Sequence, residues 1–334
     1  MYILGLESSC DETSAAVVEM SEGVRKIKSN IIASQIDTHR LYGGVVPEIA
    51  SRAHIEAISR ITYEALEVAG ITLADVGLVA VTSHPGLIGA LLVGVNFAKS
   101  LAYANNIPLV GVNHIKGHIA ANYLAFSELE PPFTALVVSG GHTSIYNAEN
   151  YTSLVEIGGT RDDAAGEAFD KIGRVIGLPY PAGAAMDKLA CEGDKTAVTL
   201  PSPALAGDTL DFSFSGIKTA ALNYLNSSKQ AGVEINRADL AASYTEKIVS
   251  TVVKKTEMAL LQNNSKKLAV AGGVAANSHL RAALEAMCKK RKVEFYVPPL
   301  SLCGDNAAMI AAAGYYKFLD GKTADTSLNA SALD

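Results

Sequence analysis

A repeated strand, turn and strand pattern constrains the fold of this chain more than any other feature. Apolar segments at 2–6 and 15–19 flank a polar turn, which predicts a β-hairpin. The pattern returns about half a chain later, with apolar segments at 134–138 and 144–148 around a second small polar turn. A strand at 268–271 then leads through two glycines into a helix that Asn277 can cap. The sequence therefore predicts an α/β fold of two lobes built by duplication, with both turns pointing into one cleft.

The turns themselves are suited to binding phosphate. Gly140 and Gly141 carry no side chain that would block the approach of an oxyanion to their backbone N–H groups. Gly273 offers a similarly close approach for a nucleoside, just before a helix start. A glycine pair alone is weak support, but three such elements in this order favour a nucleotide site.

Two histidines four residues apart, His114 and His118, form the clearest metal-binding pattern. On a helix both rings lie on one face, within reach of one ion. Without a third ligand, two histidines at this spacing are more often core or surface residues that bind no metal. The best candidate for the third ligand is Asp305. A zinc protease would need a glutamate where Ile115 stands, which disfavours peptide hydrolysis. Two imidazoles and a carboxylate suit Fe²⁺, Zn²⁺ or Mn²⁺.

Periodicity predicts the elements that carry these ligands. Helices are expected over 53–70 and 94–105, and a strand over 107–112 that runs into the histidine helix. Asp305 precedes a helix expected over 307–318, which it could cap while also binding the metal. We expect the histidine helix to leave the first lobe and the Asp305 helix to return to it from the second, so that the site joins the lobes.

Composition narrows the class of protein. The chain has 334 residues, 49% of them hydrophobic and 19% charged, which is enough for two lobes with a sizeable core. The longest apolar run, 86–95, is well below the roughly 20 residues that span a bilayer. No signal peptide is evident, and the four cysteines form no CxxC pair, so we expect a cytoplasmic protein with reduced thiols. The net charge of −6 disfavours unaided binding of nucleic acid.

Several segments together resemble one known family, the TsaD threonylcarbamoyltransferases that modify tRNA. They belong to the actin-like, sugar-kinase and Hsp70 ATPase superfamily. The matching segments run through almost the whole chain: 7–13, 43–48, 51–54, 114–118, 138–143, 162–171, 212–219, 272–277 and 303–309. The resemblance implies two ribonuclease-H-like lobes around a central nucleotide cleft, here 1–127 with 306–334, and 128–305. Gly304 departs from the small hydroxyl residue expected there, beside a proposed metal ligand.

The family also implies a reaction. The threonylcarbamoyl group of threonylcarbamoyl-AMP would pass to N6 of the adenosine that follows the anticodon (position 37) in tRNAs reading ANN codons, and AMP would leave. Metal ligands carried over by position are His114, His118 and Asp305, with Fe²⁺ expected and Zn²⁺ possible. The phosphate and acyl end of the donor would meet Val137, Val138, Ser139, Gly140 and Gly141. The nucleoside would meet Asp170, Gly183, Asp187 and Asn277.

Asp11 and Glu12, in the first turn, are hypothesised catalytic groups that orient the substrate or handle its proton. A polar hairpin tip can equally hold an aspartate for structural reasons alone. Asp163, Glu167 and Asp170 have helical spacing, which by itself is more typical of a solvated helix face.

Three other functions compete with the transferase. A metallopeptidase is disfavoured by Ile115, and an ATPase or kinase of the same superfamily would bind Mg²⁺ through carboxylates and water. A noncatalytic subunit is disfavoured because both the metal ligands and the nucleotide turns are present. Partners implied by the resemblance are tRNA, a TsaB-type paralogue and a TsaE-type ATPase, with the adenylate made by a separate synthase and no membrane involved. The helix around 47–66 is a plausible docking surface.

Overall fold

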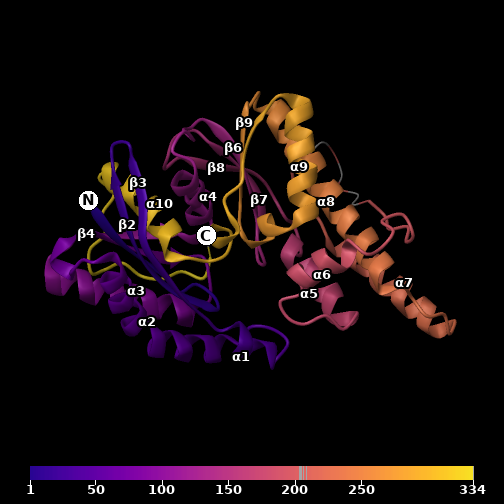
Figure 1. Ribbon diagram of the computed structural model, residues 1–334, viewed down its shortest axis with the longest axis horizontal. Helices are drawn as coiled ribbons and strands as arrows, with labels where there is room; N and C mark the ends of the chain where they lie inside the picture. The colour runs from indigo at the N-terminus through magenta and orange to yellow at the C-terminus, as the bar shows by residue number, and fades with distance from the viewer. Residues whose placement is uncertain (203–204, 206, 208, 334) are drawn as a thin grey trace. The chain divides into compact units, whose positions relative to one another are not determined.

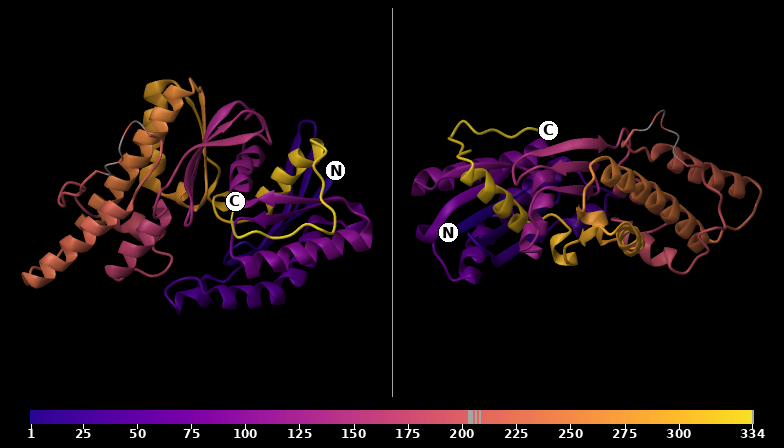
Figure 2. Two further views of the ribbon diagram at one scale, coloured as in Figure 1. Left: turned by 180° about the vertical axis from the view of Figure 1, so that it is seen from behind. Right: turned by 90° about the horizontal axis from the view of Figure 1, so that it is seen from above.

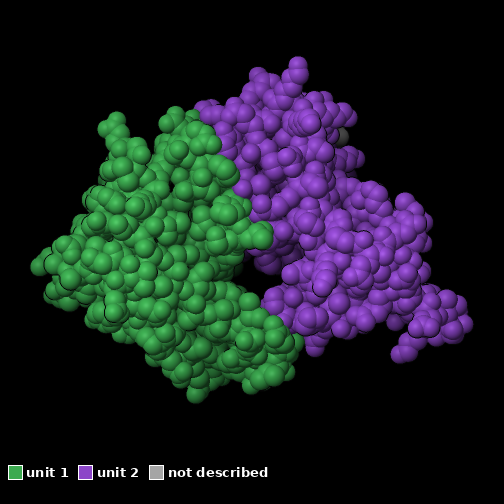
Figure 3. Space-filling view, viewed as in Figure 1, with its two compact units in different colours: residues 1–131, 150–154, 298–334 green, residues 132–149, 155–297 purple. Residues whose placement is uncertain are grey.

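The computed structural model describes residues 1–202, 205, 207 and 209–333. The chain forms two compact units, shown in green and purple in Figure 3. Unit 1 comprises Met1–Pro131, Asn150–Leu154 and Pro298–Asp334, and unit 2 comprises Pro132–Glu149 and Val155–Val297. The chain re-enters unit 1 ahead of Asp305, whereas the sequence led us to expect the return after this residue.

Unit 1 is built on a five-stranded mixed sheet (Figure 1). Its spatial order is β3 (Val24–Ser34), β2 (Glu12–Ser21), β1 (Tyr2–Glu7), β4 (Val76–His84) and β5 (Leu109–Asn113). The first three strands are antiparallel, while β1, β4 and β5 run parallel. The predicted first hairpin is thereby confirmed, with Tyr2 opposite Glu19 and Glu7 opposite Ser14. The carboxyl ends of β1, β4 and β5 share one edge of the sheet, where ligand sites in such folds gather.

Alternating residues of β1 serve the two faces of this sheet. Leu4 and Leu6 join a buried cluster with side chains of α2 (Pro47–Ala69) and α3 (Ile88–Asn105). Gly5 faces the other way, toward α10 (Ala307–Leu319), which packs along the sheet beside α4 (His114–Ala125) (Figure 2). A Cβ on Gly5 would lie 2.1 Å from the Ala307 carbonyl oxygen, so only glycine permits this approach.

Smaller elements complete unit 1. The helix α1 (Ile36–Arg40) precedes α2, and short 3-10 turns lie at η1 (Leu73–Asp75) and η3 (Leu300–Leu302). At the β5 edge, Leu109 forms an antiparallel bridge with Ala324, and the Ser331 N–H donates to the Ser83 carbonyl at 2.9 Å. The segment after α10 therefore covers this edge of the sheet.

Unit 2 repeats the plan of a hairpin with parallel neighbours. Its sheet has the order β10 (Glu294–Tyr296), β9 (Lys267–Ala271), β6 (Phe133–Val138), β7 (Thr143–Ala148) and β8 (Leu154–Gly159). β6 and β7 are antiparallel, whereas β6, β9 and β10 are parallel, so the predicted second hairpin is also confirmed. The remaining elements are α5 (Ala165–Val175), α6 (Gly183–Ala190), α7 (Ser215–Gln230), α8 (Arg237–Gln262), η2 (Gly273–Ala276) and α9 (Ser278–Arg291).

The predicted helices are confirmed in kind, with differences at their starts. The helix expected from residue 53 begins at Pro47, and the one expected from 94 begins at Ile88. Proline suits the first turn of a helix, where its missing N–H is not needed. Asn277 caps α9 as predicted, its Oδ1 accepting from the Leu280 N–H at 2.8 Å. Among the described residues, no helix is both long enough and apolar enough to cross a membrane.

Candidate functional site

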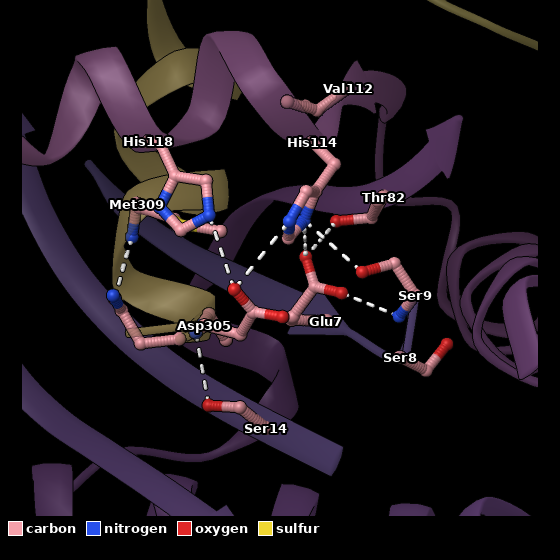
Figure 4. A network of polar contacts seen from close by, with 12 residues as sticks. Glu7, Ser8, Ser9, Ser14, Thr82, Val112, His114, His118, Asp305 and Met309 are labelled. Carbon is pink, nitrogen blue, oxygen red and sulfur yellow. Dashed lines mark hydrogen bonds and ion pairs between the residues drawn. The ribbon is translucent and has the colours of Figure 1, made fainter. Parts of the chain in front are cut away.

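The two histidines stand at the start of α4, as the sequence predicts. Asn113 ends β5 and caps the helix, its Oδ1 accepting from the Lys116 N–H at 2.9 Å. This cap fixes the first helical turn directly after the strand. His114 and His118 therefore project from one face, with ring centroids 4.7 Å apart and both side chains buried (Figure 4).

Asp305 meets both imidazoles. Its Oδ1 lies 3.1 Å from His118 Nε2 and 3.5 Å from His114 Nε2 (Figure 4). Ligand atoms of the three residues all lie within 4.8 Å of one another, so they could hold one metal ion. All three belong to unit 1, so the expectation that the site joins the two lobes was wrong. The Asp305 carboxylate comes from the loop before α10, and that loop returns to unit 1 several residues earlier than expected.

The expected helix cap at Asp305 was also wrong. Asn306 is the N-cap of α10, with its Oδ1 accepting from the Met309 N–H at 3.0 Å. Ser14 helps to fix the same turn, because its Oγ accepts from the Ala307 N–H at 3.0 Å. Because Asn306 and Ser14 fix this turn, the Asp305 carboxylate is turned toward the histidines rather than toward the helix.

A glutamate that the sequence reading missed orients His114. The Glu7 side chain is fully buried, and its Oε2 lies 3.0 Å from His114 Nδ1 and accepts from Thr82 Oγ1 at 2.6 Å (Figure 4). Its Oε1 accepts from the Ser9 N–H. A His114 Nδ1–H that donates to Glu7 leaves Nε2 as the metal-binding atom. An acidic residue at the end of an apolar strand was the available signal.

The charges of these groups are coupled. Burial by itself would lower the pKa of His114, but the charges of Asp305 and Glu7 raise that pKa to about 9. Burial would raise the pKa of Glu7, but the charge of His114 and its hydrogen bond hold that pKa below the ordinary value. Without an ion, His114 is therefore an imidazolium between two carboxylates. A metal ion would take the place of its Nε2 proton.

His118 supplies a direct test of whether the residues fit a metal. Both ring nitrogens are buried, and within the described chain neither makes a well-aligned hydrogen bond, although Nε2 lies 3.1 Å from the Asp305 carboxylate. An unsatisfied buried polar group costs free energy. A metal ion at Nε2 would satisfy one of the two nitrogens, so the donor set fits a divalent cation.

Asp11 and Glu12 lie at the hairpin tip beside this centre. Both side chains are half-buried, and Glu12 Oε1 accepts from Ser34 Oγ at 3.1 Å. Burial and then the negative charges of Asp305 and Asp11 raise the pKa of Glu12 to about 9. Burial and the same two carboxylates also raise the pKa of the Cys10 thiol. The structure thus brings the hypothesised catalytic pair within electrostatic reach of the metal ligands.

The second turn, in unit 2, is shaped by backbone contacts. The Ser139 N–H donates to the His142 carbonyl at 2.8 Å, which closes the turn after Val137 and Val138 of β6. The N–H groups of Gly166 and Glu167 donate to the carbonyls of Ser139 and Gly140, at 3.2 and 3.1 Å. The turn therefore rests on the first turn of α5. A Cβ built on Gly140 or Gly141 meets no atom within 4 Å, so this side of the turn is open.

The four nucleoside-binding candidates all lie in unit 2 and form two pairs along α6. Asp170 Oδ1 accepts from the Ala182 N–H at 2.7 Å, next to Gly183 at the helix start. Asp187, one turn further on, accepts from the Ser278 N–H at 3.0 Å, directly after Asn277.

The Asp187 carboxylate has a further partner that the sequence did not suggest. His279 Nδ1 lies 2.7 Å from Asp187 Oδ1. Burial would raise the pKa of Asp187, but the hydrogen bonds from His279 and Ser278 hold it below its usual value. Asp163 was read as part of a solvated helix face, yet it lies before α5 and pairs with Lys171 at 2.7 Å and with Lys218.

Comparison with solved structures identifies the fold. Full-length HypF, in its phosphate- and nucleotide-bound form, matches all of this chain over 47% of its own length, with 15% identity and a TM-score of 0.63. The ROK hexokinase from Thermus thermophilus covers 96% of this chain and 100% of its own, with 13% identity and a TM-score of 0.53. These proteins have the actin-like ATPase fold, so the predicted fold class is confirmed.

Sequence relatives are much more similar. A protein of Clostridium botulinum named tRNA N6-adenosine threonylcarbamoyltransferase is 54% identical over 328 residues, which is 98% of this chain and 96% of the relative. Its namesake from Clostridium perfringens is 53% identical over the same shares. The family description "TsaD: tRNA N6-adenosine threonylcarbamoyltransferase" matches residues 26–312. With this identity along nearly its full length, the chain belongs to the tRNA N6-adenosine threonylcarbamoyltransferase family.

Proposed function

We propose that this transferase takes the threonylcarbamoyl group from threonylcarbamoyl-AMP and passes it to N6 of adenosine 37 in tRNAs that read ANN codons. The observation that carries the proposal is 54% identity, over 98% of the chain, to a transferase named for N6 of adenosine in tRNA. We propose in addition that the donor is threonylcarbamoyl-AMP and that the modified adenosine is at position 37. Membership in this transferase family disfavours the alternative functions of ATPase, kinase and peptidase.

A divalent ion would be held by His114, His118 and Asp305, and we propose Fe²⁺, with Zn²⁺ as the second choice. The mixed nitrogen and oxygen donors, two of which are imidazoles, support a transition metal over Mg²⁺. When bound, such an ion supplies a Lewis acid that can withdraw electrons from an oxygen of the donor.

The reaction needs orientation more than a strong catalyst, because the donor is an activated mixed anhydride. The N6 electron pair attacks the carbamoyl carbon, the bond from that carbon to the phosphate oxygen breaks, and AMP leaves with the electron pair. The backbone N–H groups of Gly140 and Gly141 would bind the phosphate, and Val137, Val138 and Ser139 would hold this turn in place. Asp170, Gly183, Asp187 and Asn277 would surround the nucleoside, where carboxylates can accept from ribose hydroxyls.

Asp11 and Glu12 are our candidates for orienting N6 or accepting its proton. Glu12, with a pKa of about 9, holds a proton at neutral pH in the ion-free protein. It could accept a proton only when a nearby cation lowers that pKa. The role of Glu12 as a proton acceptor would therefore depend on whether the metal site is occupied.

Partner proteins are also part of the proposal, namely a TsaB-type paralogue and a TsaE-type ATPase. The helix α2 exposes apolar side chains at Ile55 and Tyr63, which supports a docking role for the surface around 47–66. A net charge of −6 supports the idea that tRNA binding needs further subunits.

A reconstituted transfer assay tests the proposal. Labelled threonine, bicarbonate, ATP, the adenylate synthase, both partners and unmodified tRNA would be combined with the wild type, His114→Ala or Asp305→Ala. We expect label in tRNA with the wild type, and a loss of at least about a hundredfold with either variant. Asp37→Ala is the matched control, because the Asp37 side chain is exposed in α1. An otherwise competent mixture that leaves tRNA unlabelled would overturn the proposal.

A further inference from the structure

A cavity of about 220 Å³ lies in unit 1, and its lining includes none of the residues assigned to the reaction. Its walls come from α4, α10, the ends of β4 and β5, and the 151–154 segment. Three lysines line it: Lys116 of α4, Lys317 of α10, and Lys322 just after α10. The volume is several times the roughly 30 Å³ of one water molecule, so a small ligand group fits.

The positive charge in this cavity is not balanced by its walls. None of the described residues that line it is acidic. Asp320, outside the lining, lies 3.2 Å from Lys322 Nζ and accepts from the Thr152 hydroxyl, so Lys322 is partly neutralised. For the Lys116 ammonium, no ion pair or hydrogen-bond acceptor is present in the part of the chain that the structure describes.

Lys317 is the most constrained of the three. Its Nζ donates to the Gly111 carbonyl of β5 at 2.6 Å. Burial lowers the pKa of Lys317, and the charges of Lys116 and Lys322 lower it further. A structural tether to β5 accounts for Lys317 alone. The tether does not explain why Lys116 and Lys322 are placed where their charges repel Lys317.

We propose that this cavity binds a phosphate-type oxyanion through Lys116, Lys317 and Lys322. An oxyanion between the three ammonium groups would offset their mutual repulsion and accept their hydrogen bonds. The Tyr151 side chain also lines the cavity, and its hydroxyl accepts from Arg25 Nη2 at 3.2 Å. The anion is a free phosphate or pyrophosphate group, or a phosphate of an RNA backbone. The site is separate from the transfer reaction proposed above.

Lysine acetylation provides a site-specific test. The full chain would be treated with an acetylating reagent at constant ionic strength, with inorganic phosphate, with pyrophosphate, or with a short single-stranded RNA lacking terminal phosphates. Mass spectrometry would follow the rate at each lysine. We expect saturable protection of Lys116 and Lys322 by at least about fivefold. Lys26, exposed on β3, is the internal control and should react at an unchanged rate.

Variants sharpen the test. Lys116→Gln should weaken the apparent affinity measured at Lys322 by about tenfold, and Lys26→Gln should leave it unchanged. Lys322→Gln, at an exposed position, provides the same readout at Lys116 if Lys116→Gln fails to fold. Protection by RNA alone would assign the anion to a nucleic acid backbone. No saturable protection by any of the three anions, or equal protection of Lys26, would overturn the proposal.

Discussion

The two units position their functional groups in opposite ways. In unit 1 the two histidines of the candidate metal site are buried, and side chains from distant segments hold them, as Glu7 holds His114. In unit 2 the candidate carboxylates accept from backbone N–H groups at helix starts, as Asp170 accepts from the Ala182 N–H before α6. A metal site needs ligand atoms preset at short range. A nucleotide site can rely on backbone groups that helices and turns already provide.

Glycine shows the same difference. A Cβ on Gly5 would lie 2.1 Å from a backbone oxygen of α10, whereas a Cβ on Gly140 would meet nothing within 4 Å. In the first unit glycine permits dense packing around the site. In the second it keeps a turn open to a ligand.

Replacing Gly5 should have the largest effect, and replacing Gly140 is its matched comparison. Gly5→Ala should lower the free energy of unfolding by about 3 kcal/mol, because backbone cannot move aside for the new Cβ. Gly140→Ala should change the free energy of unfolding by less than about 1 kcal/mol and lower the transfer rate about tenfold. Urea unfolding and the transfer assay measure the two quantities. Equal losses of stability in both variants would remove the contrast between the units.

Loss of the Glu7 carboxylate, which orients His114, should have the second-largest effect. Glu7→Gln keeps the shape of the side chain but removes the charge that faces Nδ1, so the affinity for the metal should fall about 10- to 100-fold. Competition with a chelator measures this affinity. Glu48→Gln, at an exposed position of α2, is the control. Unchanged affinity in Glu7→Gln would mean that Ser9, whose Oγ lies 3.1 Å from the same nitrogen, suffices to orient the ring.

The smallest predicted effect concerns pH. The pKa of Glu12 is about 9 in the folded chain and near 4.5 in the unfolded chain, so the folded state binds more protons between these values. Stability should therefore fall as pH rises from 4.5 to 9. Glu12→Gln removes this penalty and should raise the free energy of unfolding at pH 8.5 by about 1 kcal/mol, reduced by solvent screening. At pH 4 the two proteins should be equally stable.

Thermal unfolding in the presence of a chelator, at both pH values, checks this prediction. Added metal should shrink the difference, because a cation lowers the pKa of Glu12. Glu19→Gln, on the same strand, is the control, because Glu19 lies opposite Lys26 of β3. A gain of the same size at pH 4 would show that the Glu12 effect comes from packing rather than charge.

Local patterns predicted the elements that hold the site. The two hairpins follow from apolar segments around polar turns, and the histidine pair follows from spacing on a helix. Helix starts were harder, since α2 begins at Pro47, ahead of the start expected at residue 53. Asp305 and Asn306 are both able to cap a helix, and their order in the chain does not reveal which one does.

Long-range contacts could not be predicted. Glu7 is 107 residues from His114 and 75 from Thr82 in sequence, and no local pattern joins them. The return of the chain to unit 1 before Asp305 was missed for a similar reason, because pseudo-symmetry of the hairpins does not fix where a connection crosses. The lysine cavity also joins α4 with α10, whose separation in sequence hides their contact in the fold.

The metal centre draws on the beginning, the middle and the end of the chain, through Glu7, His114 with His118, and Asp305. Asp305 is synthesised long after both histidines, so during translation the two imidazoles are present before the carboxylate that faces them. An ion held by all three ligands, as proposed above, would therefore bind only after the segment that carries Asp305 has folded onto α4.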